Sequence, residues 1–270
     1  MFAGDIEPMK SATIELWGQG EYRGEAEDGF RPTLDAYVLD GTRTRDAVLI
    51  CPGGGYRCIS PREAEPVALQ FNAAGYHAFV LRYSVDPRRH PQPLLDAARA
   101  LALIRDRAEE WKLRPDRVAA CGFSAGAHLA ASLGVRWEEC YVQERPSALI
   151  LCYPVISSGE FAHRGSFERL LGPEAGPELR KRASLELRVD EKTPPTFLWH
   201  TFDDESVPLE NSLLFAQALR SKGRPFELHV YPRGAHGLSL ATPETDEGGT
   251  PPDPHVATWM GLCLEWLRGL

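Results

Sequence analysis

A serine with the surroundings of a nucleophile lies in the pentapeptide Gly122-Phe123-Ser124-Ala125-Gly126. A serine hydroxyl is a weak nucleophile unless a base takes its proton and N–H donors stand beside the reacting carbonyl. An apolar run precedes the pentapeptide and an alanine-rich stretch follows it, so this G-x-S-x-G pattern predicts a sharp turn between a strand and a helix. The crowding of such a turn favours glycine on both sides of the serine. The alternative is a glycine-rich turn without chemistry.

Two loops later in the chain carry a base and an acid that orients the base. Asp203 and Asp204 follow the apolar run 196–200, and His236 follows the run 226–231. In open parallel sheets, catalytic residues come from loops at the carboxyl ends of strands. We therefore predict a triad of Ser124, His236 and one of the two aspartates, in the chain order Ser, Asp, His. A solvated loop histidine is the alternative.

Three consecutive glycines follow the apolar run 47–51. Glycines at the end of an inner strand indicate that the backbone approaches another group closely or adopts a positive φ. We interpret the loop as an oxyanion hole, in which the amides of Gly54 and Gly55 join the amide of Ala125 at the start of the helix. Whether the Tyr56 amide joins them stays open, and a flexible loop is the alternative.

The elements that position these residues alternate along the chain from residue 47 onward. Mainly apolar segments predict strands at 47–51, 77–83, 117–121, 148–153, 196–200 and 226–231, and the continuous apolar run 47–51 is a candidate inner strand. Helices are predicted at 94–113, directly after Ser124, at 209–221 and at 255–269. Segments 12–17 and 32–39 alternate apolar and polar residues, as half-buried antiparallel strands do. The sequence thus predicts an α/β fold with a mostly parallel central sheet and helices on both faces.

One segment interrupts this alternation. Residues 155–193 are charged, contain several glycines and prolines, and separate two inner strands by more than a simple crossover needs. We interpret the segment as a partly helical insertion over the site, within a single domain that spans residues 1–270. Tyr56, Arg57, Tyr83 and His163 are candidates for pocket walls, and a plain structural or solvated role is the alternative for each.

Composition excludes several classes of partner. The 270 residues hold 30 basic and 38 acidic side chains, for a net charge of −8, which argues against nucleic acid and anionic membranes. No run approaches 18 apolar residues, and residues 1–16 lack the apolar core of a secretory signal. The six cysteines form no C-x-x-C pair, so we expect buried free thiols, no metal site and a cytoplasmic protein.

These motifs make the chain resemble the α/β-hydrolase superfamily over nearly its whole length, and within it small esterases of the acetyl xylan esterase and carbohydrate esterase type. The stretches that carry the resemblance are Pro52-Gly53-Gly54-Gly55-Tyr56, Gly122-Phe123-Ser124-Ala125-Gly126, Thr193-Pro194-Pro195-Thr196-Phe197, residues 204–208 (D-x-x-V-P) and His236-Gly237. Two positions depart from the pattern: Pro52 stands where related esterases often have His, and Ala127 where many have Gly.

The resemblance implies the acid and the substrate. In the related esterases Val-Pro follows the acid, as Val207 and Pro208 follow Asp204, so Asp204 is implied as the acid and Asp203 as a turn or capping residue. It implies hydrolysis of short acyl esters, acetyl above all, of xylo-oligosaccharides or related sugars, with neither cofactor nor metal. The oligomeric state stays open, and a homo-oligomer is among the alternatives.

Two other functions share parts of this pattern. A serine peptidase of the prolyl-oligopeptidase type has the same order of triad residues, but it usually has glycine where Ala127 stands, and a large accessory domain. A non-catalytic ligand-binding protein on a hydrolase fold is the other alternative. Such proteins usually lose a triad residue, and all three residue types are present here.

Overall fold

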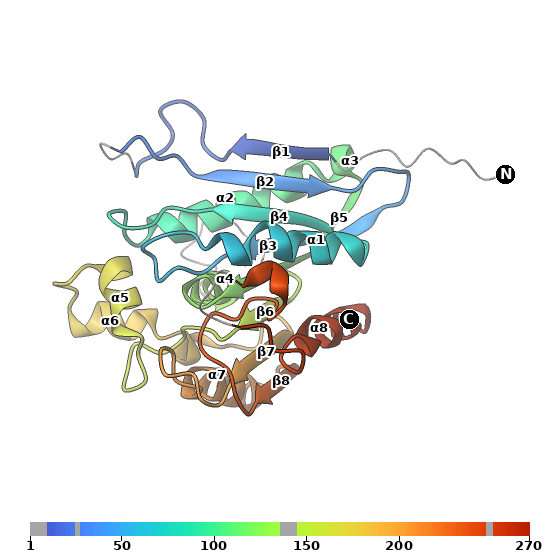
Figure 1. Ribbon diagram of the computed structural model, residues 1–270. Helices are drawn as coiled ribbons and strands as arrows, with labels where there is room; N and C mark the ends of the chain where they lie inside the picture. The colour runs from blue at the N-terminus through green and yellow to red at the C-terminus, as the bar shows by residue number, and fades with distance from the viewer. Residues whose placement is uncertain (1–9, 25–27, 136–144, 247–250) are drawn as a thin grey trace.

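The computed structural model describes residues 10–24, 28–135, 145–246 and 251–270. The described residues form eight strands in one sheet, ordered β1-β2-β4-β3-β5-β6-β7-β8 (Figure 1). The strands are β1 (Lys10–Glu15), β2 (Thr33–Val38), β3 (Arg45–Cys51), β4 (His77–Arg82), β5 (Leu113–Phe123), β6 (Leu149–Cys152), β7 (Thr196–Thr201) and β8 (Phe226–Tyr231). The α-helices are α1 (Glu65–Ala73), α2 (Gln92–Asp106), α3 (Ala108–Trp111), α4 (Ala125–Val135), α5 (Arg164–Leu171), α6 (Pro177–Ala183), α7 (Glu210–Ser221) and α8 (Thr258–Arg268).

Strand direction follows the predicted pattern. The two pairs at one edge, β1 with β2 and β2 with β4, are antiparallel, and every other pair of neighbours is parallel. The carboxyl ends of β3, β5, β6, β7 and β8 therefore open toward one edge of the sheet. The loops after these strands carry Gly54, Ser124, Asp204 and His236, so the topology gathers the predicted site residues.

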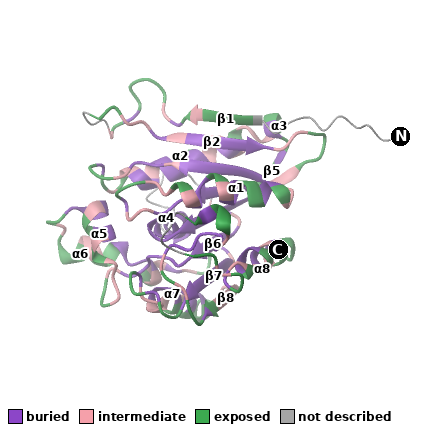
Figure 2. Cartoon of the chain, viewed as in Figure 1, coloured by how far each residue is buried: buried purple, intermediate pink, exposed green. Residues whose placement is uncertain are grey.

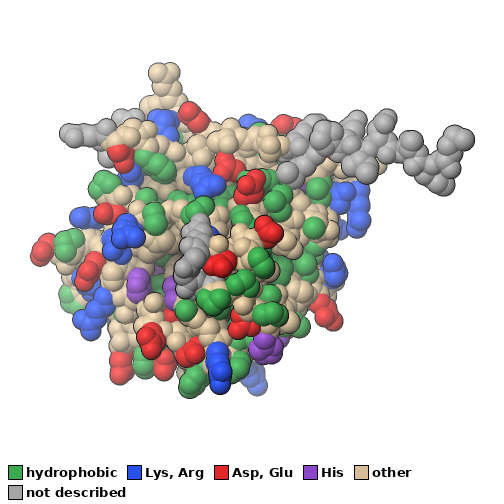
Figure 3. Space-filling view, viewed as in Figure 1, with side chains coloured by type: hydrophobic (Ala, Val, Ile, Leu, Met, Phe, Trp, Pro, Cys, Tyr) green, Lys and Arg blue, Asp and Glu red, His purple; other side chains and the backbone are tan. Residues whose placement is uncertain are grey.

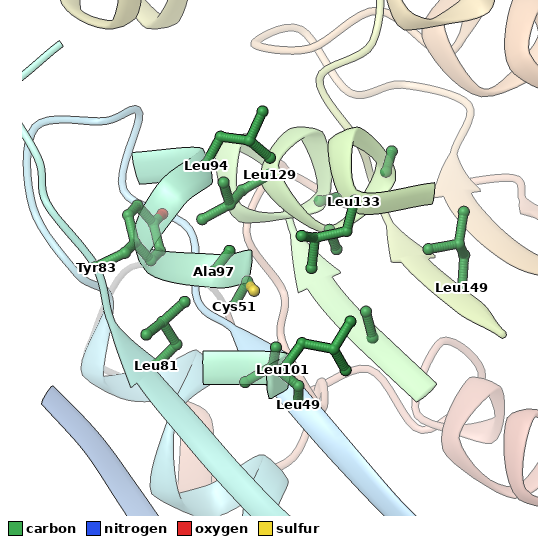
Figure 4. Close-up of a cluster of buried hydrophobic side chains, with 14 of the residues drawn as sticks. Leu49, Cys51, Leu81, Tyr83, Leu94, Ala97, Leu101, Leu129, Leu133 and Leu149 are labelled. Atoms are coloured by element: carbon green, nitrogen blue, oxygen red, sulfur yellow. The ribbon is translucent and has the colours of Figure 1, made fainter. Parts of the chain in front are cut away.

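Helices cover both faces of the sheet, as the sequence predicts. Side chains alternate along β3: Leu49 and Cys51 belong to one buried cluster, and Val48 and Ile50 to the other. Helices α2, α4 and α7 pack on the face of Leu49, and α1 and α8 pack on the opposite face (Figure 1). The central strands are accordingly buried along most of their length (Figure 2). In the larger cluster, leucines of the sheet meet leucines of α2 and α4 (Figure 4).

The helix predicted at 94–113 is divided in the structure. Helix α2 ends at Asp106, the short α3 follows, and Lys112 adopts a left-handed conformation with φ of 51°. A residue in this conformation cannot continue a right-handed helix, so the chain turns there into β5. Strand β5 is longer than predicted because Leu113 already pairs with Arg45 of β3.

Segment 155–193 contains α5, α6 and the 3-10 helix η3 (Leu185–Arg188). The two α-helices lie beside the carboxyl edge of the sheet, apart from its two layers of helices (Figure 1).

The cysteines differ in part from the expectation. Cys51, Cys121, Cys152 and Cys263 are buried free thiols, whereas Cys58 is exposed because it lies in the loop after β3 rather than in a strand. Cys140 and the first nine residues lie outside the described part of the chain. Among the described helices, none combines the length and apolarity needed to cross a bilayer.

Candidate active site

Ser124 stands on the predicted turn between β5 and α4. Its φ is 53°, a left-handed conformation that is strained for a side chain other than glycine, and it is 7% exposed. The turn is tight: a Cβ on Gly122 would lie 2.3 Å from the carbonyl oxygen of Gly126, and one on Gly126 would lie 2.1 Å from that of Cys51. Both flanking glycines are therefore required by close packing of backbone.

The structure brings Ser124, His236 and Asp204 together in one line of hydrogen bonds. His236 Nδ1 is 2.6 Å from Asp204 Oδ2, and His236 Nε2 is 2.8 Å from Ser124 Oγ. A carboxylate only accepts hydrogen bonds, so Nδ1 carries a proton and donates a hydrogen bond to Asp204. Nε2 is then left as the acceptor of the serine hydroxyl, which is the arrangement that a general base requires.

Asp204 is held rigidly and kept ionised. Its Oδ1 accepts the backbone N–H groups of Ser206 and Val207, both at 2.9 Å. Its Oδ2 accepts His236 and lies 3.2 Å from Nε2 of His200. Burial raises the pKa of this carboxyl, but the hydrogen bonds from His200 and His236 outweigh it and hold the pKa well below its usual range.

His200 is a member of the site that the sequence analysis missed. The side chain is fully buried at the end of β7, with Nε2 2.9 Å from the carbonyl of Val207 and Nδ1 2.8 Å from Ser212 Oγ. Because Val207 O and the Asp204 carboxylate only accept, Nε2 must carry the proton and Nδ1 accepts from the Ser212 hydroxyl. His200 therefore steadies the same carboxylate oxygen that accepts His236. Its position at the end of an inner strand, four residues before the acid, was the available signal.

Asp203 lies in a turn, as expected, and its side chain makes a further contact. Its Oδ1 accepts the backbone N–H of Gly234 at 2.6 Å. The loop after β7 is thereby tied to the loop that carries His236.

The glycine loop after β3 takes up conformations that suit glycine. Gly54 has φ of 125° and Gly55 has φ of 63°, and a Cβ on Gly54 would lie 2.1 Å from the carbonyl oxygen of Cys58. The N–H of Gly53 is already engaged within the protein, since it donates to Glu63 Oε2 at 2.7 Å. Within the described residues, no acceptor is recorded for the N–H groups of Gly54, Gly55 and Ala125, which stay predicted oxyanion donors.

A cleft of about 580 Å³ opens over Ser124 and His236. Of the candidate wall residues, Arg57 and His163 line it. Burial and the neighbouring His236 and Arg169 lower the pKa of His163. Tyr83 does not line the cleft but supports the glycine loop after β3, because its hydroxyl donates to the carbonyl of Pro52 at 2.6 Å.

Helix α5 also reaches the cleft. Arg169 lines it beside His163 and donates to the carbonyl of Gly55 at 3.4 Å. The hydroxyl of Tyr56, by contrast, points to the buried His128, with 2.9 Å between its oxygen and Nδ1. On the face seen in Figure 3, acidic and basic side chains are interspersed and no broad basic surface is visible.

Comparison with known proteins identifies the family of this chain and several relatives. A family model named BD-FAE matches residues 34–219. The chain is 40% identical over 252 residues to endo-1,4-beta-xylanase B of Butyrivibrio fibrisolvens, a match that covers 89% of this chain and 40% of that protein. It is 32% identical over 202 residues to the acetylxylan esterase of Xylanibacter ruminicola, covering 73% of this chain and 42% of that protein. The chain thus spans about two fifths of the length of these two relatives.

Solved structures extend the comparison. The acetyl ester-xyloside bifunctional hydrolase from Caldicellulosiruptor lactoaceticus superposes with a TM-score of 0.87 at 42% identity, with 96% of each chain covered. MGS-M1, an alpha/beta hydrolase from a deep-sea metagenome library, superposes with a TM-score of 0.78 at 34% identity, with 97% of each chain covered. The predicted relationship to small esterases of the α/β-hydrolase fold is confirmed, and the chain belongs to the BD-FAE family.

Proposed function

We propose that this chain is a serine carboxylic ester hydrolase that removes short acyl groups, acetyl above all, from xylo-oligosaccharides or related sugars. The observation that carries the proposal is the line from Ser124 through His236 to Asp204, with hydrogen bonds of 2.8 and 2.6 Å, at the base of an open cleft. Nucleophile, base and orienting acid stand in the order that ester hydrolysis requires.

The first half of the reaction transfers the acyl group to the protein. His236 Nε2 takes the proton of Ser124 as Oγ attacks the ester carbonyl carbon, and Asp204 stabilises the imidazolium that forms. The N–H groups of Gly54, Gly55 and Ala125 bind the negative oxygen of the tetrahedral intermediate. When the intermediate collapses, the imidazolium gives its proton to the departing sugar oxygen, and an acyl group remains on Ser124.

The second half reverses these roles with water. His236 takes a proton from a water molecule, whose oxygen attacks the acyl carbon. The collapse of the second intermediate returns the proton to Ser124 Oγ and releases the carboxylic acid, which ionises to acetate.

The substrate class is supported by the cleft and by the relatives. The cleft of about 580 Å³ falls in the range of small-molecule sites, and one of its walls comes from Arg169 of α5 and from His163, directly before α5. The names of two relatives refer to acetylxylan and to an acetyl ester. We propose that residues 1–270 form one catalytic domain and that 155–193 is the insertion that borders the sugar side of the cleft.

The proposed location is the cytoplasm. Four free thiols are buried in the core, and a reducing compartment keeps such groups reduced.

The test is release of acetate from a panel of acetylated xylo-oligosaccharides, with butyrate esters and acetylated pectin fragments for comparison. An aminoacyl-p-nitroanilide in the same panel tests the peptidase alternative. We expect acetate release by the wild type and none by Ser124→Ala. The circular dichroism spectrum and Tm of this variant should match those of the folded wild type. Cleavage of the anilide without ester hydrolysis would contradict the proposal.

A further inference from the structure

A buried carboxylate outside the proposed triad lies at the base of the cleft. Glu63 ends the 3-10 helix η1 (Pro61–Glu63), is 3% exposed, and lines the cleft together with Ser124 and His236. Its Oε2 accepts the N–H of Gly53 at 2.7 Å, and its Oε1 accepts the hydroxyl of Tyr153 at 2.6 Å. A carboxylate removed from water needs such bonds, and they hold in place the groups that donate them.

The bond to Gly53 fixes the start of the glycine loop. A Cβ on Gly53 would lie 2.7 Å from Glu63 Oε2 and 3.1 Å from Ser124 Cβ, so the carboxylate packs against backbone directly beside the proposed nucleophile. The carbonyl of Gly53 accepts the N–H of Ser60 at 3.0 Å, which closes the loop from the other side. The direction of the chain is thus set at Gly53, and with it the orientation of the Gly54 and Gly55 peptides that follow.

The bond to Tyr153 reaches the histidine. Tyr153 follows β6, and its hydroxyl donates to Glu63 while accepting the backbone N–H of Ser239 at 2.9 Å. Its ring meets the ring of His236 edge to face, with centroids 5.0 Å apart and an angle of 71°. The phenol therefore supports both the imidazole and the loop that follows it.

The residue before Glu63 holds the same loop. The carbonyl of Arg62 accepts the hydroxyl of Ser239 at 2.7 Å, and its guanidinium donates to the carbonyl of Gly237. Gly237 and Ser239 lie directly after His236, so helix η1 is bonded to the histidine loop at two points and to the glycine loop at one.

We propose that Glu63 is a positioning residue that couples the glycine loop to the histidine loop, through Gly53 on one side and through Tyr153 and Ser239 on the other. This inference rests on the proposed esterase function. The oxyanion and the imidazolium exist only during the reaction, so a loss of this coupling lowers kcat and leaves KM largely unchanged.

The test is steady-state hydrolysis of p-nitrophenyl acetate by Glu63→Gln. A glutamine has one carbonyl oxygen, so it accepts from Gly53 or from Tyr153 but not from both. We expect kcat to fall about 10- to 100-fold with KM within about threefold, since displacing a catalytic group by about 1 Å costs on the order of 10²-fold. Tyr153→Phe keeps the ring and removes the hydroxyl, and it should show the same split. The losses in the double variant should be smaller than the product of the single losses, because both act through one network.

Asp96→Asn is the matched control. Asp96 is fully buried in α2 and accepts the indole N–H of Trp17 and the backbone N–H of Ser84, both at 2.8 Å, but it is not part of the cleft lining. This variant should lower Tm and leave kcat per folded molecule unchanged.

The inference is overturned if Glu63→Gln and Tyr153→Phe lose stability but keep the wild-type kcat, as the control does. It is also overturned if KM rises while kcat is kept. If Glu63→Gln does not fold, Tyr153→Phe decides alone. A wild type that hydrolyses no ester overturns the proposed function instead, and the parallel wild-type rate distinguishes the two failures.

Discussion

Replacing Asp204 by asparagine should reverse the hydrogen-bond roles at the proposed base. The backbone N–H groups of Ser206 and Val207 require an acceptor at Oδ1, so the asparagine oxygen takes that place. Its NH₂ group then occupies the position of Oδ2, 2.6 Å from His236 Nδ1 and 3.2 Å from Nε2 of His200. A donor thus faces the Nδ1 atom that donates in the wild type.

The expected loss follows from the histidine tautomer. Nδ1 of His236 must become an acceptor, which moves the ring proton to Nε2. Nε2 then donates toward Ser124 and cannot take its proton. In a Ser-His-Asp site this substitution costs about 10⁴ in kcat, equivalent to about 5 kcal/mol of transition-state stabilisation.

The same substitution should change how stability depends on pH. The native pKa of Asp204 lies below its value in the unfolded chain, so the carboxylate stabilises the native state above about pH 4. This contribution is lost as pH falls toward the native pKa. Asparagine makes no such contribution, so we expect the free energy of unfolding of the Asp204→Asn variant to be about 1–3 kcal/mol below that of the wild type at pH 7. This difference in stability should become smaller in acid.

The assays are p-nitrophenyl acetate hydrolysis and urea unfolding at several pH values. Asp203→Asn is the matched control, because its amide oxygen still accepts the N–H of Gly234. We expect less than a tenfold loss from the control. The reasoning is refuted if Asp204→Asn stays within tenfold of the wild type, if Asp203→Asn is the more damaging change, or if the stability gap widens on acidification.

Three further substitutions test the surrounding structure. Gly126→Ala places a Cβ 2.1 Å from the carbonyl oxygen of Cys51 and should lower the free energy of unfolding by about 1–3 kcal/mol or more in urea titrations; wild-type stability would contradict the packing argument. Gly54→Ala, at φ of 125°, places a Cβ 2.1 Å from the carbonyl oxygen of Cys58 and should displace the N–H groups of this loop, which lowers kcat on p-nitrophenyl acetate by about 10²-fold, the cost of one lost oxyanion donor; an unchanged kcat would contradict a role of this loop in the site. Hydrogen bonds from Arg145 hold the pKa of Asp190 low, so Asp190→Asn should lower the free energy of unfolding by about 1 kcal/mol at pH 7 and by less in acid, measured by urea unfolding. An equal loss of stability at the two pH values would refute this role of the ion pair.

The fold followed from local patterns. Val48 to Cys51 form a continuous apolar run because both faces of an inner strand are buried, and this signal is readable without any tertiary contact. The turn at Ser124 was readable because its geometry admits only glycine on both flanks, which leaves a mark in the sequence itself. The chain order of acid and histidine then followed from strand topology.

The residues that support the site through long-range hydrogen bonds could not be predicted from the sequence. Glu63 and Tyr153 lie 90 residues apart, and nothing in either local sequence shows that one carboxylate serves both. The type of a polar residue does not reveal whether the fold buries it. Burial in α7 shows the same limit of residue type as a guide: Leu213 is 45% exposed, whereas Asn211 is buried because its Oδ1 accepts the backbone N–H groups of Ile156 and Ser157.

The most direct test of the account is covalent labelling by a fluorophosphonate, with the modified residue mapped by mass spectrometry. We predict one adduct per chain, on Ser124, with much slower labelling in His236→Ala and none in Ser124→Ala. An unlabelled wild type, or an adduct on another residue that survives Ser124→Ala, would contradict the central claim that these three side chains act as one catalytic unit.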